Sequence, residues 1–158
     1  MSKGHVPEAL IINGWTLLQD PSFEEAYEDL VATVEALQKN HPDAYRKKAP
    51  TKLLTAIDKL TKDIIPADLT SSAFDMGNTI GSECRAWKRA KFLQQFRLFF
   101  RYDTKSKIVI YGWVNEQDTK RAYGSKTDAY RIFQKRLAAG GPPTDWSDPM
   151  KRTAPVDQ

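Results

Sequence analysis

The sequence predicts an α+β fold in which an N-terminal αα-hairpin packs on a small antiparallel β-sheet and a further helix follows the sheet. Three observations support this prediction. Apolar residues recur at helical spacing between residues 21 and 65, whereas residues 87–114 alternate with a period of two. A helical period then returns over residues 126–137. The succession of periods therefore predicts helices, then strands, then one last helix.

The chain begins its regular structure with a short apolar segment, residues 10–18, which contains Asn13-Gly14. This segment is interpreted as a first strand or as an irregular entry segment. Asp20-Pro21 follows and offers an N-cap with a proline at the first helical position. The first helix is therefore expected from Pro21 to about Lys39.

The second helical segment is interrupted by a proline. Pro50 predicts a break or kink, because its ring cannot continue a helix without strain. The second half is expected to begin near Thr51 and to stop before Pro66, and the two helices are expected to form an αα-hairpin. Residues 66–83 are rich in Pro, Ser, Asp and Gly and are interpreted as a loop.

Three strands are predicted from alternation and from aromatic and β-branched residues, over residues 87–92, 96–102 and 107–114. Residues 103–106, Asp-Thr-Lys-Ser, form a natural hairpin connection between the last two strands. Because consecutive strands with short connections pair side by side, an antiparallel meander is expected.

The C-terminal part contains one helix and an extended tail. The helix is expected from Lys126 to Leu137, and Gly140-Gly141-Pro142-Pro143 ends it. Trp146 is the one anchor expected in the tail. The predicted organisation is an N-terminal arm over residues 1–12, a single domain over residues 13–140 and a tail over residues 141–158.

Length and composition exclude several classes of protein. A chain of 158 residues with 41% hydrophobic residues suits one ordinary domain with a real core. No apolar run approaches the roughly 20 residues of a membrane-spanning helix, and no secretory signal precedes the domain. Cys84 is the only cysteine, which excludes an intramolecular disulfide and a cysteine-based zinc site. We therefore expect a soluble cytoplasmic protein without a membrane partner.

Charge is distributed unevenly along the chain. The net charge is +4, yet residues 81–136 alone contain 14 Lys and Arg against five Asp and Glu. The same stretch is rich in aromatic residues. A basic and aromatic stretch of this kind attracts polyanions, and a solvated basic face above an aromatic core is the plainer alternative.

Alternation along the first two predicted strands gathers the cations on one face. Arg89 and Lys91 point to the same side of one strand, and Arg97 and Arg101 point to the same side of the next. If the two faces coincide, four cations converge, and guanidinium groups are well shaped to bind phosphate oxygens. The alternative is that the stems of the arginines cover apolar surface while their charged ends pair with acids.

The residue types favour a particular phosphate chemistry. The basic stretch has no group of spaced carboxylates for a two-metal site, and the two histidines of the chain, His5 and His41, fall outside it. An RNA substrate carries its own nucleophile, the ribose 2′-hydroxyl. A cationic cluster then needs only to orient this group, stabilise the charge of the transition state and assist proton transfer. A lysine or tyrosine beside other cations could act as the base.

Several longer motifs resemble the YhaV-type toxins of the RelE/ParE toxin superfamily, and the order of predicted elements resembles the superfamily as well. The motifs are Asn13-Gly14-Trp15, residues 49–54 (APTKLL), 87–92 (WKRAKF), 96–102 (FRLFFRY), 112–115 (GWVN), 123–130 (YGSKTDAY) and 141–146 (GPPTDW). They are collinear and cover most of residues 13–146. The resemblance implies a RelE-like fold and the toxin of a bacterial type II toxin–antitoxin system.

The resemblance also implies an activity and its residues. The activity is a metal-independent endoribonuclease that cleaves mRNA in connection with translation at the ribosome, needs no cofactor, and is neutralised by a PrlF-type antitoxin. Arg89 and Arg97 would bind the scissile phosphate, Lys91 would assist proton transfer, and Tyr123 would stack on a base or donate a proton. The RNA-binding residues expected around them are Lys88, Arg101, Lys120, Arg121 and Lys126, of which either Arg101 or Arg121 could stabilise the phosphate.

Two alternatives stay open from the sequence. One is a ParE-like or inactive member that binds protein or nucleic acid without cutting it, and the other is a general RNA-binding module. The cations concentrated on the predicted central strands favour the nuclease. A homodimer and a hetero-oligomer with the antitoxin are both compatible with the sequence.

Overall fold

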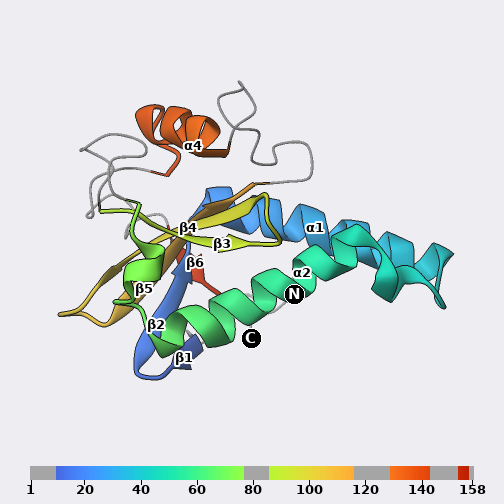
Figure 1. Ribbon diagram of the computed structural model, residues 1–158, viewed down its shortest axis with the longest axis horizontal. Coiled ribbons are helices and arrows are strands. Elements are labelled where there is room, and N and C mark those ends of the chain that lie inside the picture. The colour runs from blue at the N-terminus through green and yellow to red at the C-terminus, as the bar shows by residue number, and fades with distance from the viewer. Residues whose placement is uncertain (1–9, 77–85, 116–128, 143–152, 157–158) are drawn as a thin grey trace, which may run out of the picture.

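The structure is a computed structural model that describes residues 10–76, 86–115, 129–142 and 153–156. Its centre is a mixed β-sheet of six strands in the order β1-β2-β5-β4-β3, with β6 paired to β2. The helices α1 and α2 lie on one side of the sheet and α4 lies on the other (Figure 1). The predicted α+β class is confirmed.

The N-terminal apolar segment forms two strands. β1 (Leu10–Ile12) and β2 (Trp15–Gln19) pair in an antiparallel hairpin. Asn13 and Gly14 make the turn with φ angles of 53° and 83°, which is the left-handed conformation that Asn-Gly adopts readily. The expectation of a single strand was therefore wrong, although the Asn-Gly pair carried the signal for a turn.

The first helix follows as expected. α1 (Pro21–Asn40) starts after Asp20, whose carboxylate accepts a hydrogen bond from the backbone N–H of Ser22 at 2.9 Å. This N-cap satisfies one of the backbone donors that the first turn leaves unpaired. The helix places Phe23, Ala26 and Val34 in buried positions.

The second helical segment departs from the prediction at both prolines. A short 3₁₀ turn, η1 (Tyr45–Lys47), precedes α2 (Ala49–Lys59), so Pro50 lies in the first turn of α2 and does not interrupt it. A proline is tolerated there because the first turn has no acceptor for its missing N–H. The segment then widens into a π turn, η2 (Leu60–Ile64), and continues through Pro66 in α3 (Ile65–Ala67). The wider turn gives room to the proline ring, which would clash in a regular helix.

The segment after α3 reaches the edge of the sheet. It contains a 3₁₀ turn, η3 (Ser72–Phe74), and buries the side chains of Leu69, Phe74 and Met76. The remainder of the expected loop lies outside the described residues. No helix in the described part of the chain has both the length and the apolar character needed to cross a membrane.

The predicted antiparallel meander is confirmed. β3 (Lys88–Phe92) pairs with β4 (Phe96–Asp103), and β4 pairs with β5 (Ile108–Val114). The sheet as a whole is not antiparallel, however, because β5 pairs in parallel with β2. The long stretch between these two strands lets the chain return in the same direction, and local patterns cannot reveal such a pairing.

A bulge in β5 sets which side chains face which helices. Phe99 is paired with Trp113 but Phe100 is paired with Tyr111, so Gly112 is the extra residue. Trp113 consequently packs on the side of α4, while Tyr111 packs on the side of α1. Simple alternation would have placed both on the same face.

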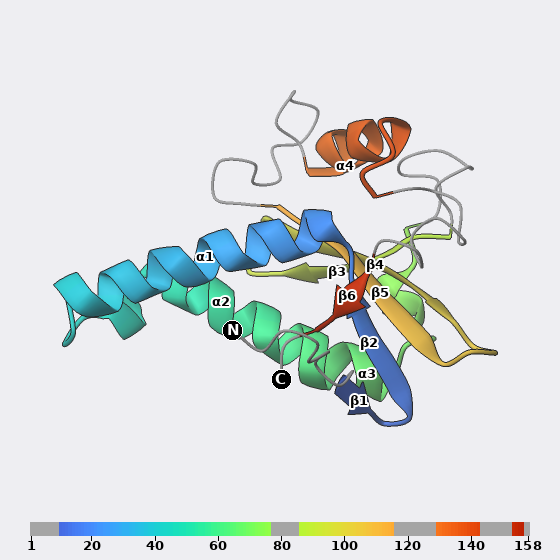
Figure 2. The ribbon, with the colours of Figure 1, turned by 180° about the vertical axis from the view of Figure 1, so that it is seen from behind.

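The C-terminal part also differs from the expected tail. α4 (Ala129–Ala138) is described over most of the predicted helix and ends before Gly140, whose φ is 80°. Further on, β6 (Ala154–Pro155) pairs with β2, and Val156 is buried. The C-terminal segment is thus attached to the sheet at a point the sequence did not indicate, while Trp146 lies outside the described residues. Figure 2 shows β6 beside β2 from behind.

Candidate nucleic-acid interface

The two cationic faces coincide, which is the condition on which the expected cluster of cations depended. The register places Arg89 opposite Phe99 and Lys91 opposite Arg97, so all four side chains share one face of the sheet. This face is the one that α4 covers. A three-residue connection between Phe92 and Phe96 fixes the register, which is why sequence alternation was sufficient to predict it.

A tyrosine from α4 joins the two central arginines. The hydroxyl oxygen of Tyr130 accepts hydrogen bonds from Nε of Arg89 at 2.9 Å and from Nε of Arg97 at 3.1 Å. The guanidinium of Arg97 also lies over the Tyr130 ring, 5.8 Å from its centroid. Tyr130 was expected only as part of the apolar stripe of the helix. A hydroxyl on a stripe that faces a cationic strand is the signal that could have identified it.

Backbone carbonyls accept hydrogen bonds from a second nitrogen, Nη1, of each arginine. Arg97 donates to the carbonyl oxygens of Gln94 and Phe96, both at 2.9 Å, and Arg89 donates to that of Ala73 at 2.8 Å. Within the described residues neither arginine forms an ion pair, so the alternative in which their charged ends pair with acids does not hold there. The two positive charges are held in place by neutral oxygens, and no described carboxylate neutralises them.

Burial differs sharply among the cations of this face. Arg97 is only 4% exposed, Arg89 is half-buried and Lys91 is exposed. A buried guanidinium without a carboxylate is costly, because hydrogen bonds to neutral groups replace only part of its hydration. Of these three cations, Arg89 and Lys91 are accessible to a large ligand while α4 is in place, and Arg97 is not.

Asn115 completes the support of Arg97 and was also missed by the sequence analysis. This side chain is 1% exposed and follows the last residue of β5. Its Oδ1 accepts a hydrogen bond from the backbone N–H of Arg97 at 2.7 Å, and its Nδ2 donates to the carbonyl of Gln95 at 3.2 Å. Asn115 therefore ties the β3–β4 turn to the end of β5.

An aromatic cluster fixes α4 on the sheet. Phe133 stacks on Phe99 with ring centroids 4.0 Å apart and meets Trp87 edge to face at 5.3 Å. Such pairs contribute about 0.5–1.5 kcal/mol each beyond the area that they bury. Arg101 lies over the Trp87 ring at 5.6 Å, so this predicted RNA-binding residue is half-buried beside the cluster.

Lys88 is not on this face. It points to the other side of β3, where its Nζ lies 3.0 Å from a carboxylate oxygen of Asp75. The other predicted residues, Lys120, Arg121, Tyr123 and Lys126, lie outside the described residues. In the part of the chain that the structure covers, no group of three or more His, Cys, Asp or Glu residues could hold a metal ion.

The known proteins that are similar to this chain all belong to one family of toxins. A family model named Toxin_YhaV, described as a toxin with endonuclease activity of a toxin–antitoxin system, matches residues 17–154. Toxin YhaV of Escherichia coli O6:H1 is 45% identical over 144 residues, which is 90% of this chain and 94% of the relative. Ribonuclease toxin YhaV of Escherichia coli strain K12 is 44% identical over the same coverage. No solved structure matches the chain significantly.

Proposed function

This chain belongs to the YhaV family of toxins with endonuclease activity, and from this premise we propose that it is a metal-independent endoribonuclease that cleaves mRNA at the ribosome. The relative named a ribonuclease toxin supports RNA as the substrate. The single observation that carries the proposal is the pair of arginines, Arg89 and Arg97, held by one tyrosine and not neutralised by a described carboxylate.

The chemistry that suits this pair is attack by the ribose 2′-hydroxyl on the adjacent phosphate. The 2′-oxygen forms a bond to phosphorus, the bond from phosphorus to the 5′-oxygen breaks, and a 2′,3′-cyclic phosphate and a 5′-hydroxyl result. One proton leaves the 2′-oxygen and one reaches the departing 5′-oxygen. Negative charge grows on the phosphate in between, and preorganised cations stabilise it.

The exposure of each cation determines the role proposed for it in this reaction. Arg89 reaches the phosphate, and the exposed Lys91 assists proton transfer at its side. Arg97 is buried and does not touch the phosphate. Its positive charge stabilises the negative charge of the phosphate from the protein interior, where the low dielectric strengthens the electrostatic attraction. Tyr123 keeps its proposed role as the residue that stacks on a base or donates a proton, and Lys120, Arg121 and Lys126 keep theirs in RNA binding.

The proposal also covers the fold type of the enzyme, its inhibitor and its place in the cell. We assign the architecture to the RelE-like type, since a hairpin of helices precedes three antiparallel strands and a last helix. A PrlF-type antitoxin is the proposed inhibitor, acting in the bacterial cytoplasm, and an acidic segment would suit the surplus of nine positive charges on residues 81–136.

One observation favours the second candidate, a module that binds RNA or protein without cutting. The guanidinium groups of Arg89 and Arg97 are both engaged in internal hydrogen bonds, as they would be in a purely structural role. The two candidates differ in the product, because only the nuclease makes new RNA ends.

The test is cleavage of end-labelled RNA in excess EDTA, with and without ribosomes, by the wild type, Arg89→Gln and the charge-matched control Lys105→Gln. Lys105 is exposed in the β4–β5 turn. We expect cyclic phosphate ends from the wild type and the control, and a rate about 10²-fold to 10³-fold lower for Arg89→Gln. Binding without cleavage under every condition would establish the second candidate, and cleavage abolished by EDTA would contradict metal independence.

A further inference from the structure

The far end of the α1–α2 hairpin extends beyond the sheet. Residues 39–52, here called the hairpin tip, comprise the end of α1, the connection and the start of α2. No side chain from Glu35 to Lys52 is buried, whereas earlier α1 residues and later α2 residues enter the core. Figures 1 and 2 show the two helices reaching past the β3–β4 turn on the same side of the molecule. Burial in the core therefore does not explain the sequence of the tip.

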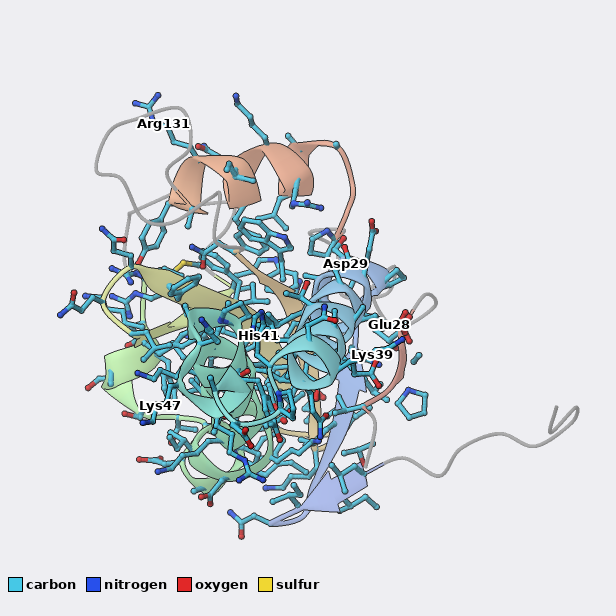
Figure 3. All side chains as sticks on the ribbon, turned by 90° about the vertical axis from the view of Figure 1, so that its right-hand side faces the viewer. Glu28, Asp29, Lys39, His41, Lys47 and Arg131 are labelled. Carbon is cyan, nitrogen blue, oxygen red and sulfur yellow. The ribbon has the colours of Figure 1, made fainter. Side chains whose placement is uncertain are left out.

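The hairpin tip is strongly basic. It contains one acid, Asp43, and five cations that are all exposed: Lys39, Arg46, Lys47, Lys48 and Lys52. None of the five forms an ion pair with a described carboxylate. Figure 3 looks at the hairpin from this end, with Lys39 and Lys47 on either side of His41. Lys39 and Lys47 thus lie on different sides of the end of the hairpin.

Three of these cations lie where they work against folding, whereas Lys39 lies in the last turn of α1, where the helix dipole favours a cation. The N-terminus of a helix has a partial positive charge and is stabilised by acids, yet Arg46, Lys47 and Lys48 directly precede the first turn of α2. That turn contains no acid, and no side chain caps it. Each such cation costs about 0.3–1 kcal/mol at an exposed site. A set of cations placed against the helix dipole is better explained by an anionic partner than by stability.

The flank of α1 has the opposite charge. Glu25, Glu28 and Asp29 are exposed on the part of α1 that lies over the sheet, and Figure 3 labels two of them. A polyanion is repelled by this flank and attracted by the tip, within a screening distance of about 8–10 Å. The binding surface is therefore confined to the end of the hairpin.

The side chains of the tip suit phosphates and not bases. The tip has two aromatic rings, those of His41 and Tyr45. Tyr45 is half-buried, and the guanidinium of Arg46 lies 5.5 Å from its ring centroid. Single-stranded RNA is usually held by successive bases stacked on several exposed rings, and the imidazole of His41 is the one exposed aromatic ring of the tip. Cations on a projecting element suit the backbone of structured RNA.

We propose that the hairpin tip is a second RNA-binding surface, which holds the phosphate backbone of structured RNA while a neighbouring single strand enters the interface at Arg89 and Lys91. The entry of the single strand at Arg89 and Lys91 rests on the proposed ribonuclease function, whereas the binding of structured RNA at the tip does not. Because the tip and the β3–β4 turn extend to the same side of the molecule, one RNA with a duplex and a loose strand can contact both.

The test measures binding of an RNA duplex by fluorescence anisotropy at several salt concentrations. Lys47→Gln/Lys48→Gln is compared with Lys59→Gln/Lys105→Gln, which removes two exposed cations elsewhere. We expect the tip variant to bind about tenfold more weakly and to lower the slope of log K against log salt by about 2. The control should behave as the wild type. Asp43→Asn, which removes the one acid, should bind more tightly, a gain that misfolding cannot produce.

Cleavage of a short single-stranded RNA distinguishes this proposal from the proposed function. The tip variant should cut it at the wild-type rate, because the short RNA does not reach the tip. Equal duplex binding by the tip variant, the control and the wild type would overturn the proposal. Loss of antitoxin binding with unchanged duplex binding would overturn it in favour of a protein partner, and absence of cleavage by the wild type would contradict the ribonuclease while leaving the duplex result intact.

Discussion

Gly112 lies beneath the indole ring of Trp87, so close that a Cβ atom on Gly112 would stand 2.5 Å from Cζ3 of the tryptophan. Trp87 directly precedes β3 and Gly112 lies in β5, so the two residues meet across β4, which lies between these strands. The contact fixes Trp87 at the base of the aromatic cluster on which α4 rests. The lack of a side chain at Gly112 thus makes room for Trp87, and Trp87 in turn supports α4, the helix that contains Tyr130.

Gly112→Ala should destabilise the protein by about 1–3 kcal/mol, because the added methyl group forces the ring of Trp87 out of its packed position. Urea unfolding followed by circular dichroism measures the loss. Trp87→Phe in the same chain should recover part of it, since the smaller ring leaves room for the methyl group. If the two substitutions prove additive, the contact does not govern the packing at this point.

Tyr130→Phe tests the acceptor that the two arginines share. The ring and its edge-to-face contact with Phe99 are kept, but two cationic donors lose a common oxygen. We expect the free energy of unfolding to fall by about 1–3 kcal/mol. We also expect RNA cleavage to slow, because Arg89 is no longer held. Stopped reactions on end-labelled RNA measure that rate.

The control for Tyr130→Phe is Tyr102→Phe, a half-buried tyrosine on the opposite face that packs against Trp15. Its stability should change by no more than about 0.5 kcal/mol. In the Tyr130→Phe background, Arg89→Gln should cost less activity than in the wild type, because the tyrosine acts through the arginine. Full additivity would show that the hydrogen bond does not position Arg89.

Gln94→Gly should stabilise the β3–β4 turn. Gln94 has a φ of +67°, a left-handed conformation that costs an L-residue about 1–2 kcal/mol and a glycine almost nothing. Allowing for the greater freedom of glycine in the unfolded chain, we expect a gain of about 0.5–1 kcal/mol in urea unfolding. The carbonyl that accepts the bond from Arg97 stays in place. Gln95→Gly, where φ is not positive, should destabilise, and a similar loss in both variants would contradict the prediction.

The stability of the protein should fall at alkaline pH in part because of Tyr111. Burial raises the pKa of this phenol well above its ordinary value of 10.0, and its hydroxyl donates to the carbonyl oxygen of Thr61 at 2.5 Å. The stabilisation is complete below pH 10 and is lost as the pH rises above it, because only the unfolded chain releases the proton. Tyr111→Phe should be less stable at pH 8 yet lose less stability between pH 9 and 11. Unfolding curves that fall in parallel for both proteins would refute this origin.

Local patterns were sufficient for much of the fold and for the centre of the site. Asp20-Pro21 marked the start of α1, because capping is decided by adjacent residues. The coincidence of Arg89 and Arg97 on one face followed from alternation and a short turn, which leave little freedom of register.

Other features depend on contacts between distant parts of the chain, which no local pattern records. The bulge at Gly112 places Tyr111 and Trp113 on opposite faces of the sheet, although alternation predicts the same face for both. The close contact of Gly112 with Trp87 accounts for a glycine at the bulge. Tyr130 has the spacing of a core residue, and its role follows from the strand that α4 happens to cover. The same limitation hid the parallel pairing of β2 with β5.

That parallel pairing determines when the protein can fold. Thr16 pairs with Ile108, so β2 is synthesised early and waits until a partner roughly 90 positions later has emerged. Contacts so remote in sequence form slowly compared with helices and hairpins. β4 in turn depends on β5 for one of its two neighbours. A chain in which β5 has not yet emerged therefore holds Arg89 and Arg97 in at most an isolated hairpin, and the sheet that carries the candidate site is completed only late in synthesis.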